Sequence, residues 1–242
     1  MFENLKNPTP FPHPYAVCAP DGLPIKEYYK DYYDEVFIFL HPFVQPYSPS
    51  LDLAETELTK FELMEQTQNV RWEEVLELLG MKDYKELDVA IRTLFGGLRE
   101  KYTNKFASEK VFNLRKEEGI YEADAGYLPI ELINPLLEAI QSEGHDWVWL
   151  GDEFGSERRL EYVYDLWQSD KLDSGRFNLF THSTGRYNLF THDNELLITT
   201  HWDSHFSMLC SDKETIERFR KSCNLEGFYC DDKTEIFWCL QD

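Results

Sequence analysis

The sequence from Gly175 to Asn194, GRFNLFTHSTGRYNLFTHDN, consists of a ten-residue segment followed by a near copy of itself. Side chains of a β-strand alternate between its two faces, so a repeat of even length keeps each copied residue on the same face. The repeat therefore predicts two adjacent antiparallel strands, 176–182 and 186–192, joined by a turn at 183–185.

The chain beyond the repeat extends these two strands into a β-meander. The dipeptide Asp193-Asn194 predicts a tight turn, and a three-residue turn at 203–205 would place Trp202 opposite Phe206 of the next strand. In this register one face of the sheet is apolar. We predict that this face is buried and that it includes Leu179, Leu189, Ile198 and Trp202.

The opposite face carries the candidate binding residues. Arg186 is flanked there by His182 and His201, and the same face holds Asn188 and His192. Imidazole and guanidinium groups in a row can hold an anion or a carbonyl group, and a histidine can act as a general acid or base near neutral pH. The same pattern is also typical of a solvated or helix-covered face whose histidines have no function. The sequence leaves both interpretations open.

We predict no metal site and no cofactor. A metal site needs three or more converging ligands, and the carboxylates nearest the histidines, Asp193 and Asp203, belong to different turns. The chain lacks GxGxxG, Walker, HExxH and GxSxG motifs, which would support nucleotide binding or hydrolysis. Ser204 stands between Asp203 and His205, but triad residues normally converge from separate segments, and we interpret the tripeptide as a turn. Whether the protein is an enzyme stays open.

The N-terminal part of the chain divides into an arm and a helical region. Residues 1–50 are rich in Pro and Tyr and predict an irregular arm with one strand at 35–41. Residues 51–170 show mainly helical periodicity, with one helix ending at Gly80, the next beginning at Asp83 and another over 157–168. A short apolar run at 146–150 predicts a strand within this region.

Residues 171–242 are mainly β. One helix interrupts this region at a capping box that begins with Ser211, and further strands are predicted at 227–230 and 235–240. The sequence therefore predicts a single α+β domain over 1–242, in which a helical N-terminal two-thirds packs on a C-terminal antiparallel β-meander with one inserted helix.

Charge and cysteine usage limit the possible partners and compartment. The 242 residues include 45 acidic and 24 basic side chains, a net charge of −21. Such a surface repels nucleic acids and anionic membranes and favours a basic protein partner, although it also simply keeps a protein soluble. No apolar run is long enough to span a bilayer, and the N-terminus has no export signal. Five cysteines without a CxxC pair are typical of a reducing cytoplasm.

The stretch Asn188–Cys210, NLFTHDNELLITTHWDSHFSMLC, together with the later GFYC and TEIFWC, resembles a bacterial family of hypothetical proteins of unknown function. This resemblance covers mainly the C-terminal third. It implies a bacterial cytosolic origin and carries over no catalytic residues. In size, acidity and α+β character the chain is also similar to immunity proteins that neutralise basic toxins.

Two functional hypotheses follow. The first is a non-enzymatic cytoplasmic binding protein, of the immunity type, whose acidic surface meets a basic partner. The alternative is an enzyme or small-ligand-binding protein that uses the His/Arg-bearing sheet face, with His182, Arg186, Asn188, His192 and His201 as its site residues.

Overall fold

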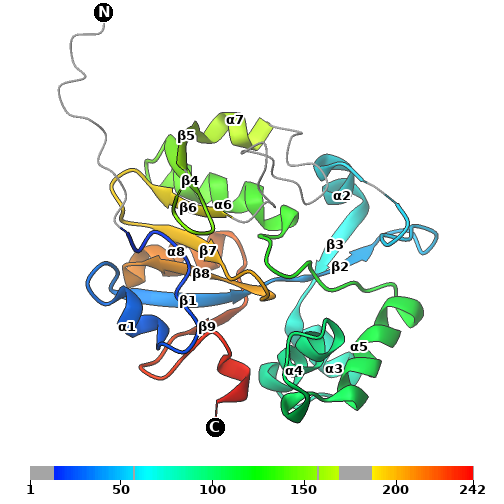
Figure 1. Cartoon of the computed structure of the whole chain (residues 1–242). Coiled ribbons are helices and arrows are strands. Elements are labelled where there is room, and N and C mark those ends of the chain that lie inside the picture. The colour runs from blue at the N-terminus through cyan, green and yellow to red at the C-terminus, as the bar shows by residue number, and fades with distance from the viewer. Residues whose placement is uncertain (1–13, 57, 157, 169–186, 242) are drawn as a thin grey trace, which may run out of the picture.

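The central sheet draws its strands from the whole chain. A computed structural model describes residues 14–56, 58–156, 158–168 and 187–241. Within them seven strands form one antiparallel sheet in the order β5-β4-β6-β7-β8-β1-β9 (Figure 1). The strands are β1 Glu35–Leu40, β4 Trp147–Asp152, β5 Arg158–Tyr162, β6 Tyr187–Thr191, β7 Leu197–Thr200, β8 Phe206–Ser211 and β9 Gly227–Tyr229.

β1 and β8 lie side by side in the interior of this sheet. They pair over their whole length, from Glu35↔Ser211 to Leu40↔Phe206. Every residue of β8 is buried, as are all residues of β1 except the first. Strands with apolar residues on both faces must be covered on both sides, so helices pack above and below the sheet.

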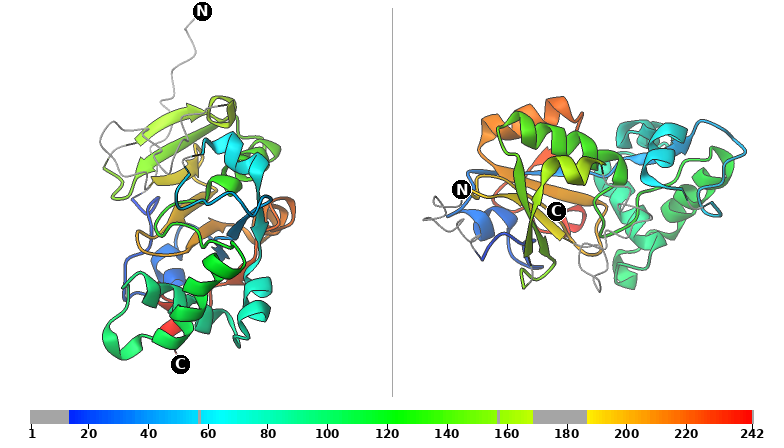
Figure 2. Two further views of the ribbon diagram at one scale, coloured as in Figure 1. Left: turned by 90° about the vertical axis from the view of Figure 1, so that its right-hand side faces the viewer. Right: turned by 90° about the horizontal axis from the view of Figure 1, so that it is seen from above.

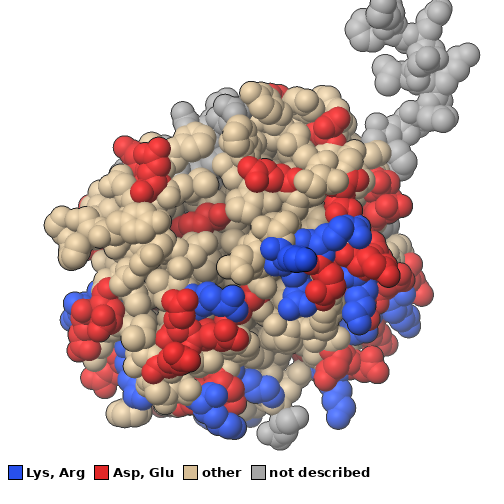
Figure 3. Space-filling model, turned by 180° about the vertical axis from the view of Figure 1, so that it is seen from behind, with Lys and Arg blue, Asp and Glu red and all other residues tan. Residues whose placement is uncertain are grey.

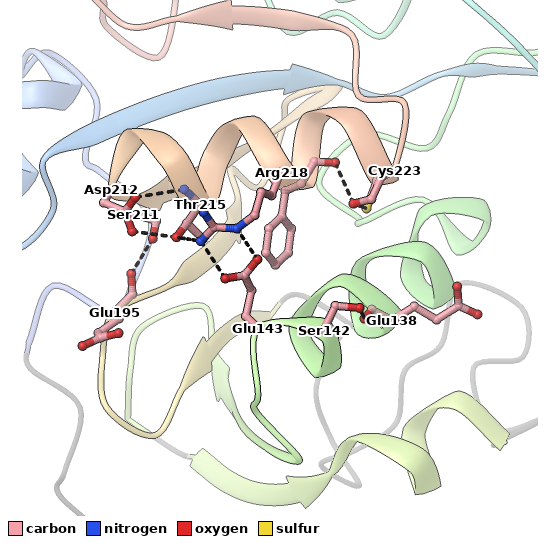
Figure 4. A network of polar contacts seen from close by, with 11 residues as sticks. Glu138, Ser142, Glu143, Glu195, Ser211, Asp212, Thr215, Arg218 and Cys223 are labelled. Carbon is pink, nitrogen blue, oxygen red and sulfur yellow. Dashed lines mark hydrogen bonds and ion pairs between the residues drawn. The ribbon is translucent and has the colours of Figure 1, made fainter.

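One face is covered by α6 (Ile130–Ser142), α7 (Val163–Gln168) and α8 (Lys213–Ser222), which lie together in Figure 2. Ile133 and Ile140 of α6 and Phe219 of α8 pack there on Leu189 and Ile198 of the sheet. The bidentate ion pair of Arg218 with Glu143, at 2.6 and 2.7 Å, connects α8 to the end of α6 (Figure 4).

The other face is covered by α1 (Ile25–Tyr29) and by the C-terminal 3-10 helix η3 (Trp238–Leu240). Beside it stands a lobe that Figure 1 shows at the lower right. The lobe and the segments that lead to it comprise β2 Phe43–Pro46, α2 Lys60–Gln66, β3 Thr67–Val70, α3 Trp72–Leu79, α4 Tyr84–Leu94, η1 Glu100–Tyr102 and α5 Lys105–Glu117. β2 and β3 pair separately, and the buried residues of α3 to α5 belong to the same core as this face of the sheet.

The prediction of a helical N-terminal two-thirds with a C-terminal meander is wrong. The strand predicted at 35–41 is confirmed as β1, but it lies inside the sheet, between β8 and β9, and not in an irregular arm. β4 and β5 pair as a hairpin, so in the described part of the helix expected at 157–168, residues 158–162 form a strand and 163–168 are helical. The strand expected at 235–240 is replaced by η3. The errors have different causes. β5 is an edge strand whose charged residues were interpreted as a solvated helix, and the apolar residues at 235–240 pack in the core without forming a strand.

Three predicted helix boundaries agree with the structure to within one residue. α3 ends at Gly80, and the carboxylate of Asp83 accepts a hydrogen bond from the backbone N–H of Glu86 at the start of α4, as expected. α8 begins one residue later than predicted, with Asp212 as its N-cap. None of the described helices is long and apolar enough to cross a membrane.

The predicted strand register is right on one side of β7 and wrong on the other. Leu189 pairs with Ile198, as the tight turn at 193–194 requires, and both are buried on the α6–α8 face. Thr200 pairs with Ser207 instead of Met208, which is a shift of one residue and turns β8 over. Trp202 is consequently 47% exposed and not part of the core. The hairpin between the repeat copies lies outside the described residues.

Replacing Leu189 by alanine tests the assignment of the core face. Leu189 is only 4% exposed, so we expect the free energy of unfolding to fall by about 2–5 kcal/mol in urea titrations. Leu78→Ala is the matched control, because Leu78 is 56% exposed and its loss should cost about 0.5 kcal/mol or less. Equal losses would contradict the assignment.

Candidate functional site

The turn between β7 and β8 carries a compact polar cluster around His201. The Nδ1 atom of His201 lies 3.0 Å from Oγ of Ser204 and 2.6 Å from Oδ1 of Asp203. On its other side Nε2 lies 3.1 Å from a carboxylate oxygen of Asp21, which is half-exposed. Burial raises the pKa of Asp203, but contacts with His201 and Arg92 outweigh it, so this carboxyl titrates below its usual range. The cluster is therefore charged at neutral pH.

Arg92 of α4 anchors this turn to the helical lobe. Its guanidinium is 1% exposed, its Nε donates to Asp88 at 2.7 Å, and its Nη2 donates to Oγ of Ser204 at 3.1 Å. Because Ser204 is fully buried and engaged by Arg92 and His201, its hydroxyl has no access to a substrate in solution. Arg92 therefore links α4 to the turn through Ser204 and Asp203, and its ion pair with Asp88 within α4 holds the guanidinium in place. Removing one partner of a buried ion pair typically costs about 3–5 kcal/mol.

Two further buried histidines lie where β1 ends and β8 begins. His41 contacts Oγ of Ser207 at 2.8 Å, and Ser207 contacts Oγ1 of Thr200 at 2.6 Å. Burial lowers the pKa of His205 to about 4, and burial together with His205 lowers that of His41 well below its usual value. Both rings are thus neutral near pH 7. The contact of His205 Nδ1 with the carbonyl of Ala123 at 3.4 Å requires the proton on Nδ1, since a carbonyl only accepts.

Residues 121–129 form a strap that passes over this turn on the way from α5 to α6. At its start Tyr121 bridges to Val44 of β2, and further along the N–H of Gly126 donates to the carbonyl of Ser204 at 2.9 Å. A Cβ atom on Gly126 would lie 2.0 Å from the carbonyl oxygen of Trp202, and the residue has φ of +79°. Only glycine therefore allows the strap to lie this close to the turn.

The outer side of the strap lines a cavity of about 290 Å³. Apolar side chains supply much of its wall, and the charged groups are Arg115, Glu122, Asp124 and Glu131. Arg115 is already occupied, because it donates to both carboxylate oxygens of Glu122, with Nε at 2.9 Å from Oε2. Two carboxyl groups, those of Asp124 and Glu131, are then left without a cationic partner among the groups that line the cavity.

Glu131 is the most unusual of these groups. It lies in the first turn of α6, where its own backbone N–H and the helix dipole favour the charged form. Burial is nevertheless the larger effect, and with the like charge of Asp124 it raises the pKa of Glu131 above its usual value. A carboxyl group that is perturbed by burial inside a cavity is a recognised mark of a binding or catalytic site.

The residues predicted as a site from sequence are divided among different places. His182 and Arg186 lie outside the described residues. Asn188 is buried, donates to the carbonyl of Asp152 at 2.8 Å and accepts from Thr199. His201 belongs to the turn cluster, and His192 is exposed in the β6–β7 turn. His192 lies with His145 and Asp193 in a group that could hold a metal ion.

Sequence reasoning missed the buried ion pair and the cavity. Asp88 and Arg92 are spaced four apart on α4, and both neighbour the buried Ile91 on the helix surface, which is a signal that charge is buried there. No pattern in the sequence indicates the cavity. Its charged residues come from α5, the strap and α6, which only the tertiary fold brings together.

Gly126→Ala tests the close approach of the strap. A methyl group would overlap backbone atoms at a positive φ, so we expect a loss of about 2–5 kcal/mol in unfolding free energy. Gly119→Ala provides the control, because Gly119 also has a positive φ but has open space around its Cβ position, and only about 1–2 kcal/mol should be lost. Similar losses would show that the strap does not contact the turn.

The lowered pKa of His205 predicts a pH dependence of stability. The unfolded chain takes up the proton near pH 6.5 and the folded chain only near pH 4, so stability present above pH 6.5 is lost as the pH falls through this window. Between pH 7.5 and pH 4 the unfolding free energy of His205→Asn should fall by about 3 kcal/mol less than that of the wild type, as measured by denaturant titrations. His192→Asn should leave the dependence unchanged, and an identical pH profile for His205→Asn would contradict a buried neutral imidazole.

Comparison with known proteins identifies the family. A family model described as protein of unknown function, DUF2711, matches residues 21–240. The comparisons with curated proteins and with solved structures give no match. The resemblance noted for the C-terminal third thus extends over nearly the whole chain, and the protein belongs to the DUF2711 family of unknown function.

Proposed function

We propose that the protein is a non-enzymatic binding protein for a basic partner, and that the cavity beside the strap receives a basic group of that partner. The observation that carries this proposal is the charge of the cavity. Three carboxyl groups line it, and its one guanidinium is paired with Glu122. An ammonium or guanidinium group would supply the missing cation.

The shape and lining of the cavity suit a lysine or arginine side chain. Leu53, Leu63 and Leu128 can cover the aliphatic stem, while Glu131 and Asp124 meet the charged end. At about 290 Å³ the cavity lies at the lower end of the range for ligand pockets, roughly 300–1,000 Å³. One side chain fits such a space better than a large cofactor does.

The charge of the whole protein favours the same class of partner. A net charge of −21 attracts basic molecules over distances of about a Debye length, roughly 8–10 Å in physiological salt. On the face shown in Figure 3, however, acidic and basic side chains are interspersed. We therefore propose that the overall charge attracts basic molecules and that the cavity selects the partner among them.

In its most specific form the proposal is an immunity-type role, in which the partner is a basic toxin that the protein neutralises. Binding a toxin requires no catalytic group, in line with the lack of a catalytic motif in the sequence. The odd number of cysteines favours a cytoplasmic setting for this role.

A second candidate is small-ligand binding on the sheet face that the sequence predicts to carry His182, Arg186 and His201. The position of His201 favours it, because its Nε2 faces the half-exposed Asp21 and not the core. Inorganic phosphate provides the test. Shifts of the His201 imidazole resonances on phosphate addition, abolished by Arg186→Gln, would support this candidate over the cavity, and the absence of shifts would remove it.

Glu131→Gln tests the cavity proposal with a fluorescently labelled lysine-rich peptide as the probe. Loss of a charge-assisted hydrogen bond is worth about 1.5–3 kcal/mol, so the affinity measured by fluorescence anisotropy should fall about 10- to 100-fold. Glu138→Gln is the matched control, since it removes the same charge from an exposed position of α6 outside the cavity lining. Equal effects of the two variants would show that binding depends on overall charge alone.

Glu131→Gln should also make the protein more stable at neutral pH. The raised pKa of Glu131 means that its contribution to stability is present below pH 4.5 and is lost as the pH rises through its folded-state pKa. Glu131→Gln should therefore melt at a higher temperature than the wild type at pH 7, with no difference at pH 4. A lower melting temperature at pH 7 would indicate that Glu131 serves the fold.

A further inference from the structure

We propose that His145, His192 and Asp193 form a binding site for a divalent transition-metal ion, with Zn²⁺ as the representative. In the described part of the chain this is the group of His, Cys, Asp and Glu whose ligand atoms converge, all within 4.8 Å of one another. The site is separate from the cavity beside the strap. It revises our expectation, made from sequence, that the protein has no metal site.

The pairing of β4 with β6 brings the three residues together. Val148 of β4 pairs with Thr191 of β6, so the residues just before β4 meet those just after β6. His145 lies before β4, and His192 and Asp193 begin the turn that leads into β7. Residues that are far apart in sequence thus share one edge of the molecule.

The backbone of His145 is fixed by the end of α6. The N–H of Gly144 donates to the carbonyl of Gln141 at 2.9 Å, and the N–H of His145 donates to that of Ile140 at 3.2 Å. The His145 side chain is 13% exposed, and its Nδ1 is buried without a hydrogen-bond partner among the described residues. A buried ring nitrogen without a partner is costly, and a metal ion would satisfy it.

The carboxylate of Asp193 is oriented towards this nitrogen. Its Oδ1 accepts hydrogen bonds from the Thr191 hydroxyl at 2.6 Å and from the Glu195 N–H at 3.2 Å. Its Oδ2 lies 3.6 Å from Nδ1 of His145, which is too far for a hydrogen bond. In metal sites, hydrogen bonds of this kind, from groups that do not touch the metal, orient a carboxylate ligand.

The distances and the ligand types suit a zinc-like ion. Bonds of about 2.0–2.2 Å in a tetrahedral site put the ligand atoms about 3.3–3.6 Å apart, which matches the separation of His145 and Asp193. The exposed ring of His192, centred 5.7 Å from that of His145, supplies the third ligand after a small movement. Two imidazoles and one carboxylate select zinc, iron, nickel or copper over magnesium or calcium. The exposed side leaves room for water as a fourth ligand.

Calorimetric titration with ZnCl₂ of the full chain, stripped with a chelator and kept in a non-thiol reductant, tests the site. We expect one equivalent to bind and the melting temperature to rise with Zn²⁺. His192→Asn, His145→Asn and Asp193→Asn should each weaken binding at least tenfold. His192 is exposed, so its variant tests the site without disturbing the core. Asp146→Asn and Glu195→Gln remove neighbouring exposed charges and should leave the affinity unchanged.

Binding of Co²⁺ distinguishes this site from the five cysteines. The expected spectrum shows tetrahedral d–d bands without a thiolate charge-transfer band. Failure of the wild type to bind one equivalent, retention of binding in His192→Asn and Asp193→Asn, or a thiolate band would each overturn the proposal. Thr191→Val should weaken binding about tenfold, with Thr191→Ser restoring it, if the hydroxyl orients Asp193.

Discussion

The pairing of β1 with β8 is the interaction on which the rest of the structure depends. Both strands are buried on both faces, so their pairing requires the chain to cover two faces with helices. It also brings the ends of distant segments together, because His41 follows β1 and His205 precedes β8. Polar groups at this end are shielded from water and contact one another, α4 and the strap, while Nδ1 of His41 and Nε2 of His205 have no hydrogen-bond partner among the described residues. The buried network and the cavity above it are therefore consequences of how the sheet closes.

The sequence predicts local structure correctly where a turn and the alternation of side chains are enough to set the strand pairing. The tight turn at 193–194 and the alternation around it give the correct pairing of Leu189 with Ile198. The next register was wrong because we required one face to be polar. Phe206 and Met208 lie on that supposedly polar face, in the core that also contains Tyr29 of α1 and Trp238 of η3. Period-two alternation cannot reveal a layer of helices that covers a face from elsewhere in the chain.

The candidate sites were even less accessible to sequence reasoning. His192 and His201 were selected because they cluster in sequence. Each has partners in its own turn, but one further partner of each lies far away along the chain, His145 for His192 and Asp21 for His201. Glu131 stands in no motif at all. Glu131 stands out because it is desolvated in the cavity beside the strap and because Arg115, the cation of that cavity, is already paired with Glu122. Each of these is a property of the tertiary fold.

Asp88 and Glu131 are both desolvated, but the charges that act on them are of opposite sign, and this difference bears on the proposed function. Asp88 is fully buried but contacts Arg92 at 2.7 Å within α4, so its charge is compensated within the fold, and Arg92 in turn contacts Ser204 of the β7–β8 turn. Glu131 is desolvated too, yet the charge that acts on it is the like charge of Asp124. A fold gains no stability from such an arrangement, and an uncharged side chain of the same size would fit it better. We therefore propose that the carboxyl group of Glu131 serves a cation that arrives from outside, and on this ground we favour the cavity over the cluster around His201 as the site for a basic partner.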